Sequence, residues 1–145
     1  MQSADTHLLI HAADPDSPNH ESARRFFATL SDTQDEFVLC ELVLVELYMQ
    51  LRNPAVFVAP YSARESAVYC QALKRNPSWR CVDYDPLVSQ KIWAWAADTK
   101  AGFRQIIDTR IALTLRHHGV THFATANVKH FKDFGFVKVW NPMVE

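Results

Sequence analysis

Glycine is scarce in this sequence of 145 residues: Gly102, Gly119 and Gly135 are the only three, and they stand far apart. Isolated glycines cannot form the glycine-rich loop that cradles phosphate groups. The low glycine content, together with 48% apolar residues, also excludes a disordered or linker-like chain. The composition predicts one domain spanning residues 1–145, since about 100–150 residues is the commonest domain size.

Cysteines and long apolar runs are also few. Cys40, Cys70 and Cys81 lack the Cys-x-x-Cys spacing of metal and redox sites and stand among apolar neighbours, so we expect buried free thiols in a reducing compartment. No apolar run approaches the roughly 20 residues that span a bilayer, and residues 1–5 show no signal-peptide pattern. The sequence therefore predicts a soluble, cytoplasmic protein with no membrane association.

An excess of charge of one sign is absent as well, because 15 Lys and Arg residues stand against 16 Asp and Glu. This balance argues against a uniformly basic surface for bulk nucleic-acid binding and against an acidic solvating tail. The charges are nevertheless placed unevenly: residues 1–50 have a net charge of −7, and residues 51–145 a net charge of +6. Chance placement of solvated charges explains these counts equally well.

Hydrophobic periodicity and turn signals divide the chain into alternating helices and strands. Ser62 and Glu65 form a capping box, Asp85 followed by Pro86 is typical of a helix start, and Gly119 is typical of a helix end. The patterns predict helices at about 20–30, 41–51, 62–74, 85–98 and 104–118, and strands at 37–40, 79–82, 120–125 and 136–140. Alternation of this kind predicts an α/β fold whose central sheet is mainly parallel and flanked by helices on both faces.

Glu46 is the most informative single residue, because it shares a helix face with Leu42, Val45 and Met49. Burying an unpaired carboxylate costs several kcal/mol, so this side chain needs a cation, a hydrogen-bond network or a metal ion. The alternative is a buried ion pair with an arginine.

Asp108 repeats this pattern on a later helix. Ile111, Ala112 and Leu115 follow it at the spacings of one helix face, so its carboxylate belongs to the inward stripe near the helix N-terminus. A helix N-terminus favours an anion, and a plain capping role is the competing interpretation.

Further polar residues stand where strands meet their loops. Asn127 and His130 follow the strand expected at 120–125, and ligands bind α/β sheets at such carboxyl ends. Asp5 stands beside the first apolar run of the chain. A turn-forming Asn, a surface His and a solvated Asp are the corresponding alternatives.

Several carboxylates brought together from separate segments would suit Mg²⁺ or Mn²⁺ better than zinc, which prefers His and Cys. Such an ion activates water and orients phosphate, which indicates phosphodiester hydrolysis. A rival pattern is Asp83-Tyr84-Asp85, which suggests a phosphatase nucleophile pair, although a helix start already explains Asp85.

Five segments, spread over nearly the whole chain, carry a resemblance to a known family. They are residues 5–10 (Asp-Thr-His-Leu-Leu-Ile), 41–48, 51–54, 107–112 (Ile-Asp-Thr-Arg-Ile-Ala) and 122–131. Each segment is modest alone, but their order and spacing resemble a PIN domain, and specifically the VapC-type toxin ribonucleases of bacterial toxin–antitoxin pairs.

This resemblance implies a Mg²⁺- or Mn²⁺-dependent endoribonuclease that acts on RNA, is held inactive by a cognate antitoxin and forms a homodimer. It places the family's acidic metal ligands, which are also its catalytic residues, on Asp5, Glu46 and Asp108. The sequence departs from the family pattern at two positions: His130 replaces the fourth acid, and His7 replaces an Asn. The alternative function is a PIN-fold domain that binds RNA or antitoxin and has weakened or lost catalysis through His130.

In the mechanism that follows, the three acids bind the ion directly or through water, and metal-activated water attacks the phosphorus. Asn127 orients a ligand or phosphate, and His130 hydrogen-bonds a metal-bound water. Arg110 has a second interpretation, in which it neutralises an acid of the same site. Candidates for RNA-phosphate contacts from the basic part of the chain are Arg52, Arg104, Arg110, Arg116, Lys129 and Lys132.

Overall fold

A computed structural model describes residues 1–144 and contains one five-stranded sheet in the order β3-β2-β1-β4-β5. All four strand pairings are parallel, which confirms the predicted α/β class. The strands are β1 (Gln2–Ala4), β2 (Phe37–Cys40), β3 (Trp79–Val82), β4 (His122–Ala124) and β5 (Lys138–Trp140).

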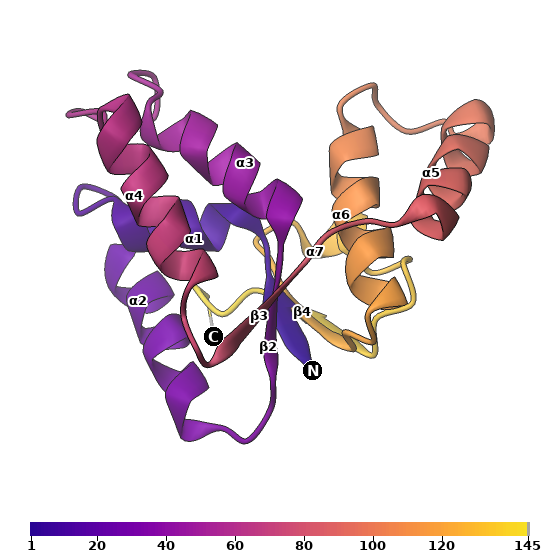
Figure 1. The fold of residues 1–145 in the computed structure, drawn as a ribbon, viewed down its shortest axis with the longest axis horizontal. Coiled ribbons are helices and arrows are strands. Elements are labelled where there is room, and N and C mark those ends of the chain that lie inside the picture. The colour runs from indigo at the N-terminus through magenta and orange to yellow at the C-terminus, as the bar shows by residue number, and fades with distance from the viewer. Residues whose placement is uncertain (145) are drawn as a thin grey trace.

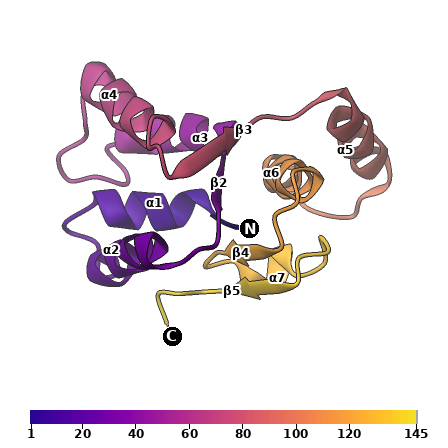
Figure 2. The same cartoon turned by 60° about the horizontal axis from the view of Figure 1, so that its bottom comes forward.

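Helices connect the strands and cover both faces of the sheet. Figure 1 shows α1 to α4 on one side and α5 and α6 on the other, and the view in Figure 2 agrees. This split follows from the strand order, because right-handed crossovers from β1 through β2 to β3 use one face and the return from β3 to β4 uses the other. The helices are α1 (Thr6–Ala13), α2 (His20–Thr29), the 3-10 turn η1 (Leu30–Asp32), α3 (Glu41–Leu51), α4 (Ala63–Lys74), α5 (Pro86–Asp98), α6 (Gln105–His117) and α7 (Val128–Phe131).

The core lies between the sheet and its two helical layers. Phe123 on β4 stacks on Phe136 with ring centroids 5.1 Å apart and contacts Phe131 of α7 at 4.7 Å. On the other side of β1, Phe37 of β2 packs against Trp79 of β3 at 4.6 Å. These aromatic pairs anchor both flanks of the short central strand β1, whose three residues are all buried.

The face of α3 that carries Glu46 is less buried than its apolar sequence predicts. Val45 is 49% exposed and Met49 is 61% exposed, whereas Val43 and Leu47 are fully buried. A helix that is apolar nearly all round, as residues 41–51 are, is expected to be buried on every side, and this expectation is wrong for the Glu46 face. The helix packs on the sheet through the opposite residues and leaves Glu46 half-buried at the border of an open surface.

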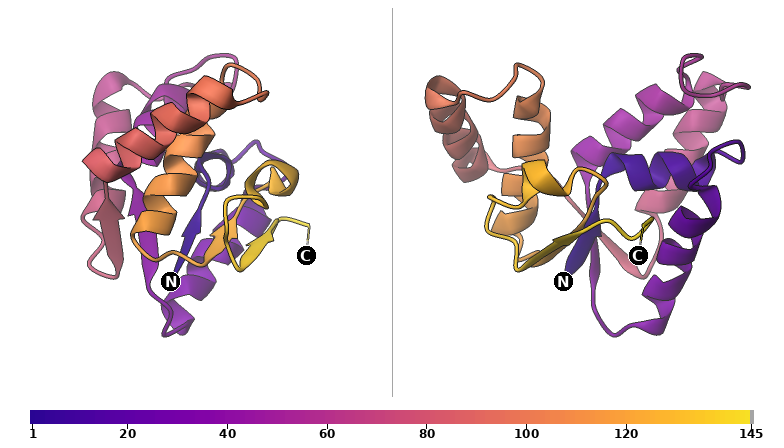
Figure 3. Two further views of the ribbon diagram at one scale, coloured as in Figure 1. Left: turned by 90° about the vertical axis from the view of Figure 1, so that its right-hand side faces the viewer. Right: turned by 180° about the vertical axis from the view of Figure 1, so that it is seen from behind.

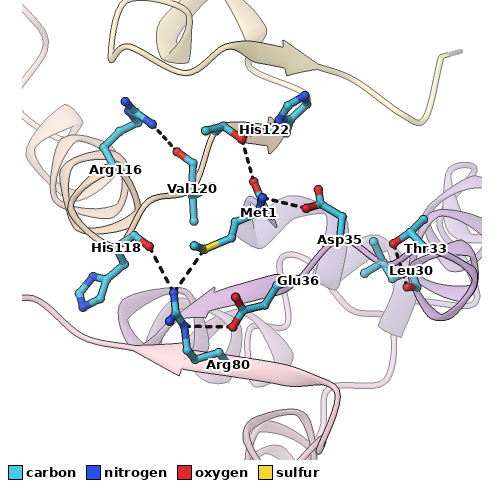
Figure 4. Close-up of polar contacts among 11 residues, drawn as sticks. Met1, Leu30, Thr33, Asp35, Glu36, Arg80, Arg116, His118, Val120 and His122 are labelled. Atoms are coloured by element: carbon cyan, nitrogen blue, oxygen red, sulfur yellow. Dashed lines mark hydrogen bonds and ion pairs between the residues drawn. The ribbon is translucent and has the colours of Figure 1, made fainter.

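The amino ends of the strands are closed by a network of polar contacts around Met1 (Figure 4). The Met1 carbonyl accepts hydrogen bonds from the backbone of Thr121 and His122, and Arg80 donates to the carbonyl of His118 at 3.2 Å. These contacts fix the end of the sheet opposite to the one where the polar site residues gather. None of the helices within residues 1–144 has both the length and the apolar character needed to cross a membrane.

Candidate active site

Three acidic side chains meet at the carboxyl edge of the sheet, next to the point where the strand order reverses. Asp5 directly follows β1 and is the N-cap of α1, Glu46 lies on α3, and Asp108 lies in the first turn of α6. Since β1 and β4 are neighbours whose connections leave on opposite faces, this is the switch point at which α/β sheets bind ligands.

Asp5 is held by hydrogen bonds to both of its carboxylate oxygens. The backbone N–H of Thr6 donates to Oδ1 at 2.8 Å, and the Thr125 hydroxyl donates to Oδ2 at 2.8 Å. Thr125 follows β4, and its oxygen in turn accepts from the backbone N–H of Asn127 at 3.0 Å. Asp5 is only 5% exposed, so these bonds fix one orientation of a buried carboxylate.

Glu46 is tied to the same segment, because the Thr6 hydroxyl donates to its Oε1 at 2.9 Å. Burial raises the pKa of the Glu46 carboxyl above its ordinary value; the Thr6 hydrogen bond acts in the opposite direction, and the charges of Asp5 and Asp108 raise the pKa further. The structure shows no arginine paired with Glu46 among residues 1–144, so the hydrogen-bond network replaces the ion pair considered from sequence.

Asp108 faces the same group of charges from α6. Burial raises the pKa of the Asp108 carboxyl, the charge of Asp5 raises it further, and His130 and His7 act in the opposite direction. Its side chain makes no capping hydrogen bond at the start of α6, so the capping interpretation does not describe it. The expected inward stripe is confirmed, since Ile111, Ala112 and Leu115 are fully buried.

The three carboxylates have no Lys or Arg partner in the part of the chain that the structure describes. The basic side chains nearest to them are histidines: His7 Nδ1 lies 4.0 Å from Asp5 Oδ2, and His130 Nε2 lies 3.7 Å from Asp108 Oδ2. An all-oxygen set of this kind suits Mg²⁺ or Mn²⁺, which keep several water ligands. Across residues 1–144, no three His, Cys, Asp or Glu side chains are grouped closely enough to hold a metal ion by themselves.

His130 occupies the position where the family pattern has its fourth acid. It lies on α7, the short gold helix in Figure 3, and its side chain is 14% exposed. Its Nε2 atom is buried and makes no hydrogen bond, because the distance to Asp108 exceeds hydrogen-bond range. Asn127, the N-cap of α7, is exposed and lies beside the site through its backbone bond to Thr125.

The basic residues proposed from sequence occupy different environments. Arg116 donates to the Val120 carbonyl at 2.6 Å, as Figure 4 shows, and so holds the turn after α6. The Arg110 guanidinium carbon lies 3.8 Å from the centre of the Tyr84 ring, and its Nη2 atom lies 3.7 Å from Asp83 Oδ1. The charge of Arg110 is therefore paired with Asp83, which is not one of the three acids. The exposed members of the set are Arg52, Arg104, Lys129 and Lys132.

The Asp83-Tyr84-Asp85 pattern has a structural role. Asp85 accepts from the backbone N–H groups of Leu87 and Val88 at the start of α5 and also contacts His117. These hydrogen bonds, with His117, hold the pKa of Asp85 below its ordinary value. Asp85 therefore caps α5, and Asp83 pairs with Arg110, so both acids have structural partners. These contacts do not support a phosphatase site at this position.

Sequence reasoning missed the two hydroxyl groups that position the acids, Thr6 and Thr125. Both are almost fully buried, and both donate to a carboxylate of the site. Thr6 stands directly after Asp5, and Thr125 ends the expected strand at 120–125. A hydroxyl residue at the carboxyl end of a parallel strand was the available signal for Thr125.

Comparison with known proteins agrees with this geometry. Residues 4–137 match the PIN domain family. Over 143 residues the chain is 43% identical to the protein named Ribonuclease VapC24 in two Mycobacterium tuberculosis strains, CDC 1551 / Oshkosh and H37Rv, and the match covers 99% of this chain and 97% of the relative.

Solved structures share the fold at lower sequence identity. Mycobacterium tuberculosis VapC20, described as a sarcin-ricin loop cleaving toxin, has a TM-score of 0.71 at 15% identity, covering 94% of this chain and 96% of that one. FitAcB from Neisseria gonorrhoeae has a TM-score of 0.65 at 19% identity, covering 98% of each chain. FitAB bound to an IR36 DNA fragment also gives 0.65 at 19% identity, covering 99% of this chain and 96% of that one. The chain thus belongs to the PIN-domain family, as a member of the VapC type.

Proposed function

We propose that this VapC-type ribonuclease, the toxin of a toxin–antitoxin pair, hydrolyses internal phosphodiester bonds of RNA with Mg²⁺ or Mn²⁺ held by Asp5, Glu46 and Asp108, directly or through water. One observation carries the metal assignment. Three carboxylates from separate segments lie near one another without any Lys or Arg partner among the described residues, and the pKa values of Glu46 and Asp108 are raised by burial and further by neighbouring carboxylates. A divalent cation relieves this repulsion, which a purely structural cluster would leave in place.

The residues of the chain prepare the site before any ion arrives. The Thr125 hydroxyl and the Thr6 backbone N–H donate hydrogen bonds to Asp5, and the Thr6 hydroxyl donates one to Glu46. Thr6 therefore positions two acids, Asp5 and Glu46, that come from different parts of the fold. A divalent ion held by the three acids would lower the pKa of a bound water and neutralise charge on the leaving oxygen. Asn127 and His130, at the rim on α7, orient the phosphate or a water of the ion, and the exposed Arg52, Arg104, Lys129 and Lys132 contact RNA phosphates.

The proposed partners follow from the comparison. A related structure contains FitAB bound to DNA, and the VapC relatives are named as ribonucleases. We infer that this chain binds a cognate antitoxin that suppresses its ribonuclease activity, and that it works as a homodimer. Both points are tested by size-exclusion chromatography with light scattering, which gives the mass of the chain alone and of the chain co-purified with its antitoxin.

The metal-site proposal is tested by RNA cleavage. The purified protein is incubated with structured RNAs and either Mg²⁺ or Mn²⁺, next to the Asp5→Ala, Asp108→Ala double variant. We expect cleavage by the wild type, its loss in the double variant and its loss in EDTA. Equal cutting by both proteins, or intact RNA with both, would contradict the assignment. Asp83→Asn is the matched control, since it removes a nearby carboxylate outside the site and is expected to keep activity.

Metal titration by calorimetry separates this function from a non-catalytic PIN-fold domain. Wild-type protein is expected to bind Mn²⁺ with measurable heat, and Glu46→Gln is expected to bind at least tenfold more weakly, because one ligand charge is gone. Absence of binding in the wild type would favour the RNA- or antitoxin-binding alternative.

A further inference from the structure

A cavity of about 390 Å³ lies beside the carboxylates and is not used by the mechanism above. Its size falls in the range of about 300–1,000 Å³ that small-molecule sites span. It is open to solvent and bordered by α5, by the segment that joins α5 to α6, by α6, and by α7 with the residues that follow it. The side chains that give it chemical character are Lys91, Trp95, Gln105, His130, Asp133 and Phe134.

The cavity borders the candidate active site at His130. This side chain lines the cavity and also lies 3.7 Å from the Asp108 carboxylate. Gln105, another lining residue, precedes Asp108 by three residues on α6, which is less than one helical turn. A group bound in the cavity would therefore lie close to Asp108, one of the three acids.

The lining combines aromatic rings with groups that donate and accept hydrogen bonds. Phe134 packs edge-on against His130 with ring centroids 5.8 Å apart, and Trp95 is half-buried on α5. No hydrogen bond of the side chains of Trp95, Gln105 or Lys91 is made within residues 1–144. Aromatic faces and unengaged polar groups in one cavity are the features that bind an unstacked RNA base.

We propose that this cavity receives an unpaired base adjacent to the scissile phosphate and so sets the base preference of cleavage. The proposal rests on the ribonuclease function proposed above and adds its specificity-determining residues. Trp95 stacks on the base, while Gln105 and Lys91, with Asp133 as an acceptor, bind its edge. A base that is paired in a helix cannot enter, so the substrate is a loop or a single-stranded segment of RNA.

The test compares cleavage of short single-stranded RNAs in which each position near the cut carries each of the four bases. We expect wild-type protein to prefer one base at a fixed position beside the cut. Trp95→Ala and Gln105→Ala are expected to reduce that preference about tenfold, the scale on which stacking and base-edge contacts act. Trp95→Phe keeps an aromatic ring and is expected to restore most of the preference.

Trp93→Ala is the matched control, because Trp93 lies on the same helix, is 65% exposed and does not line the cavity. Circular dichroism verifies that each variant is folded. If Trp95→Ala is unfolded, Gln105→Ala still decides the question. An unchanged preference in folded Trp95→Ala and Gln105→Ala, or an equal loss in Trp93→Ala, overturns the proposal.

Failure of the proposal differs from failure of the ribonuclease function itself. If wild-type protein cuts RNA in a manner that needs Asp5 and Asp108 but the cavity variants keep its base preference, only the cavity assignment is wrong. If wild-type protein does not cut RNA, or the Asp5→Ala, Asp108→Ala variant cuts equally well, both are wrong.

Discussion

At the scale of single residues, two threonine hydroxyls explain how buried carboxylates are kept in place without basic partners. Thr125 bonds Asp5 and Thr6 bonds Glu46, at 2.8 and 2.9 Å. A hydroxyl donor supports a carboxylate without neutralising it, so the negative charge stays available to a cation. A lysine or arginine in the same place would compete with that cation.

Replacing Thr125 by Val tests this support, because it removes the donor to Asp5 and the acceptor for Asn127. We expect a loss of about 1.5–3 kcal/mol in the free energy of unfolding, the usual cost of a hydrogen bond to a charged group, together with weaker Mn²⁺ binding. Urea denaturation and calorimetry measure the two effects.

Thr114→Val is the control for that substitution. Thr114 is fully buried, and its hydroxyl oxygen has no partner in the described structure. Because removing an unsatisfied buried hydroxyl carries no hydrogen-bond cost, this variant should be as stable as wild type or up to about 1 kcal/mol more stable. A similar loss in both threonine variants would contradict the role of Thr125.

His130 offers a second test at this scale. Its Nε2 atom is buried, unpartnered and close to Asp108. His130→Asp adds the fourth acid of the family pattern, so it should strengthen Mn²⁺ binding about tenfold, the size of effect that neighbours of metal ligands commonly have. His130→Asn has a similar polar shape without the charge and should show no gain. Equal affinities of the two variants, measured by calorimetry, would argue against a metal site bordered by His130.

At the scale of elements, the features that could be predicted are those with a local cause. Ser62 and Glu65 form the predicted capping box, Asp85 accepts from two backbone N–H groups before α5, and Gly119 has the positive φ of +88° expected of a helix end. Each of these depends on two to four neighbouring residues. The strands at 37–40 and 79–82 were likewise predicted at their observed bounds, because apolar runs between turn signals delimit them.

Elements that depend on distant partners could not be delimited in the same way. β1 has three residues and α7 has four, too few for a periodic pattern, and both exist because neighbouring segments pair or pack with them. β4 and β5 are shorter than predicted for the same reason, because only His122–Ala124 and Lys138–Trp140 pair with each other in the sheet. The partial exposure of Glu46 depends on how α3 lies on the sheet, which its own apolar sequence does not specify.

The turn after α6 gives a stability prediction at this scale. Gly119 has a φ of +88°, and a Cβ atom there would lie 3.2 Å from Met1 Cε. Gly119→Ala should destabilise the protein by about 1–2 kcal/mol, the cost of a left-handed conformation for a residue with a side chain. Gly102→Ala is the control, because a Cβ atom at that position has open space around it. Urea denaturation should place Gly102→Ala within about 0.5 kcal/mol of wild type.

The contact between α3 and α4 gives a pH-dependent prediction. Lys74 lies 2.9 Å from Glu41, and this hydrogen-bonded ion pair holds the pKa of the Glu41 carboxyl below its ordinary value of 4.5. A carboxyl with a lowered pKa in the folded state stabilises the fold above its unfolded pKa, and the contribution disappears as the pH falls through the folded pKa. Glu41→Gln should therefore lower the Tm by about 2 °C at pH 7 and by nothing once the pH is well below 4.

Thermal melts of Glu41→Gln and wild type across this pH range provide the measurement. Glu21→Gln is the control, because it makes the same change at an exposed residue on α2. A Tm difference for Glu41→Gln that stays constant from neutral to acidic pH would show that packing, and not the ion pair, is responsible.

At the scale of the whole molecule, the fold pairs two of the nine acids of residues 1–50 with basic residues from later segments. Arg80 lies 3.3 Å from Glu36, and Lys74 lies 2.9 Å from Glu41, both across neighbouring elements. Asp5 and Glu46 have no such partner within the described chain. Two of the negative charges of residues 1–50 are thus offset by ion pairs between elements, whereas the charges of Asp5 and Glu46 are not, and the exposed Arg52, Arg104, Lys129 and Lys132 are the candidates for phosphate contacts.

Salt dependence tests whether those basic side chains contact RNA. Lys129 and Lys132 are exposed on or beside α7, on the same short segment as His130. With an Asp5→Asn background and EDTA to prevent cleavage, the logarithm of RNA affinity should fall linearly with the logarithm of salt concentration, by about 0.7 per phosphate contact on single strands. Lys129→Ala with Lys132→Ala should reduce the slope by about 1.4, because two contacts are lost.

The matched control removes the same charge elsewhere. Arg24 and Arg25 are exposed on α2, which lies in the helical layer on the opposite side of the sheet from α6 (Figure 1). Their double alanine variant changes the net charge by the same amount, so a general electrostatic effect would lower both slopes equally. A local contact lowers only the slope of the α7 variant. Equal slopes for the two variants would remove Lys129 and Lys132 from the RNA-binding surface and leave the exposed Arg52 and Arg104 as the next side chains to substitute.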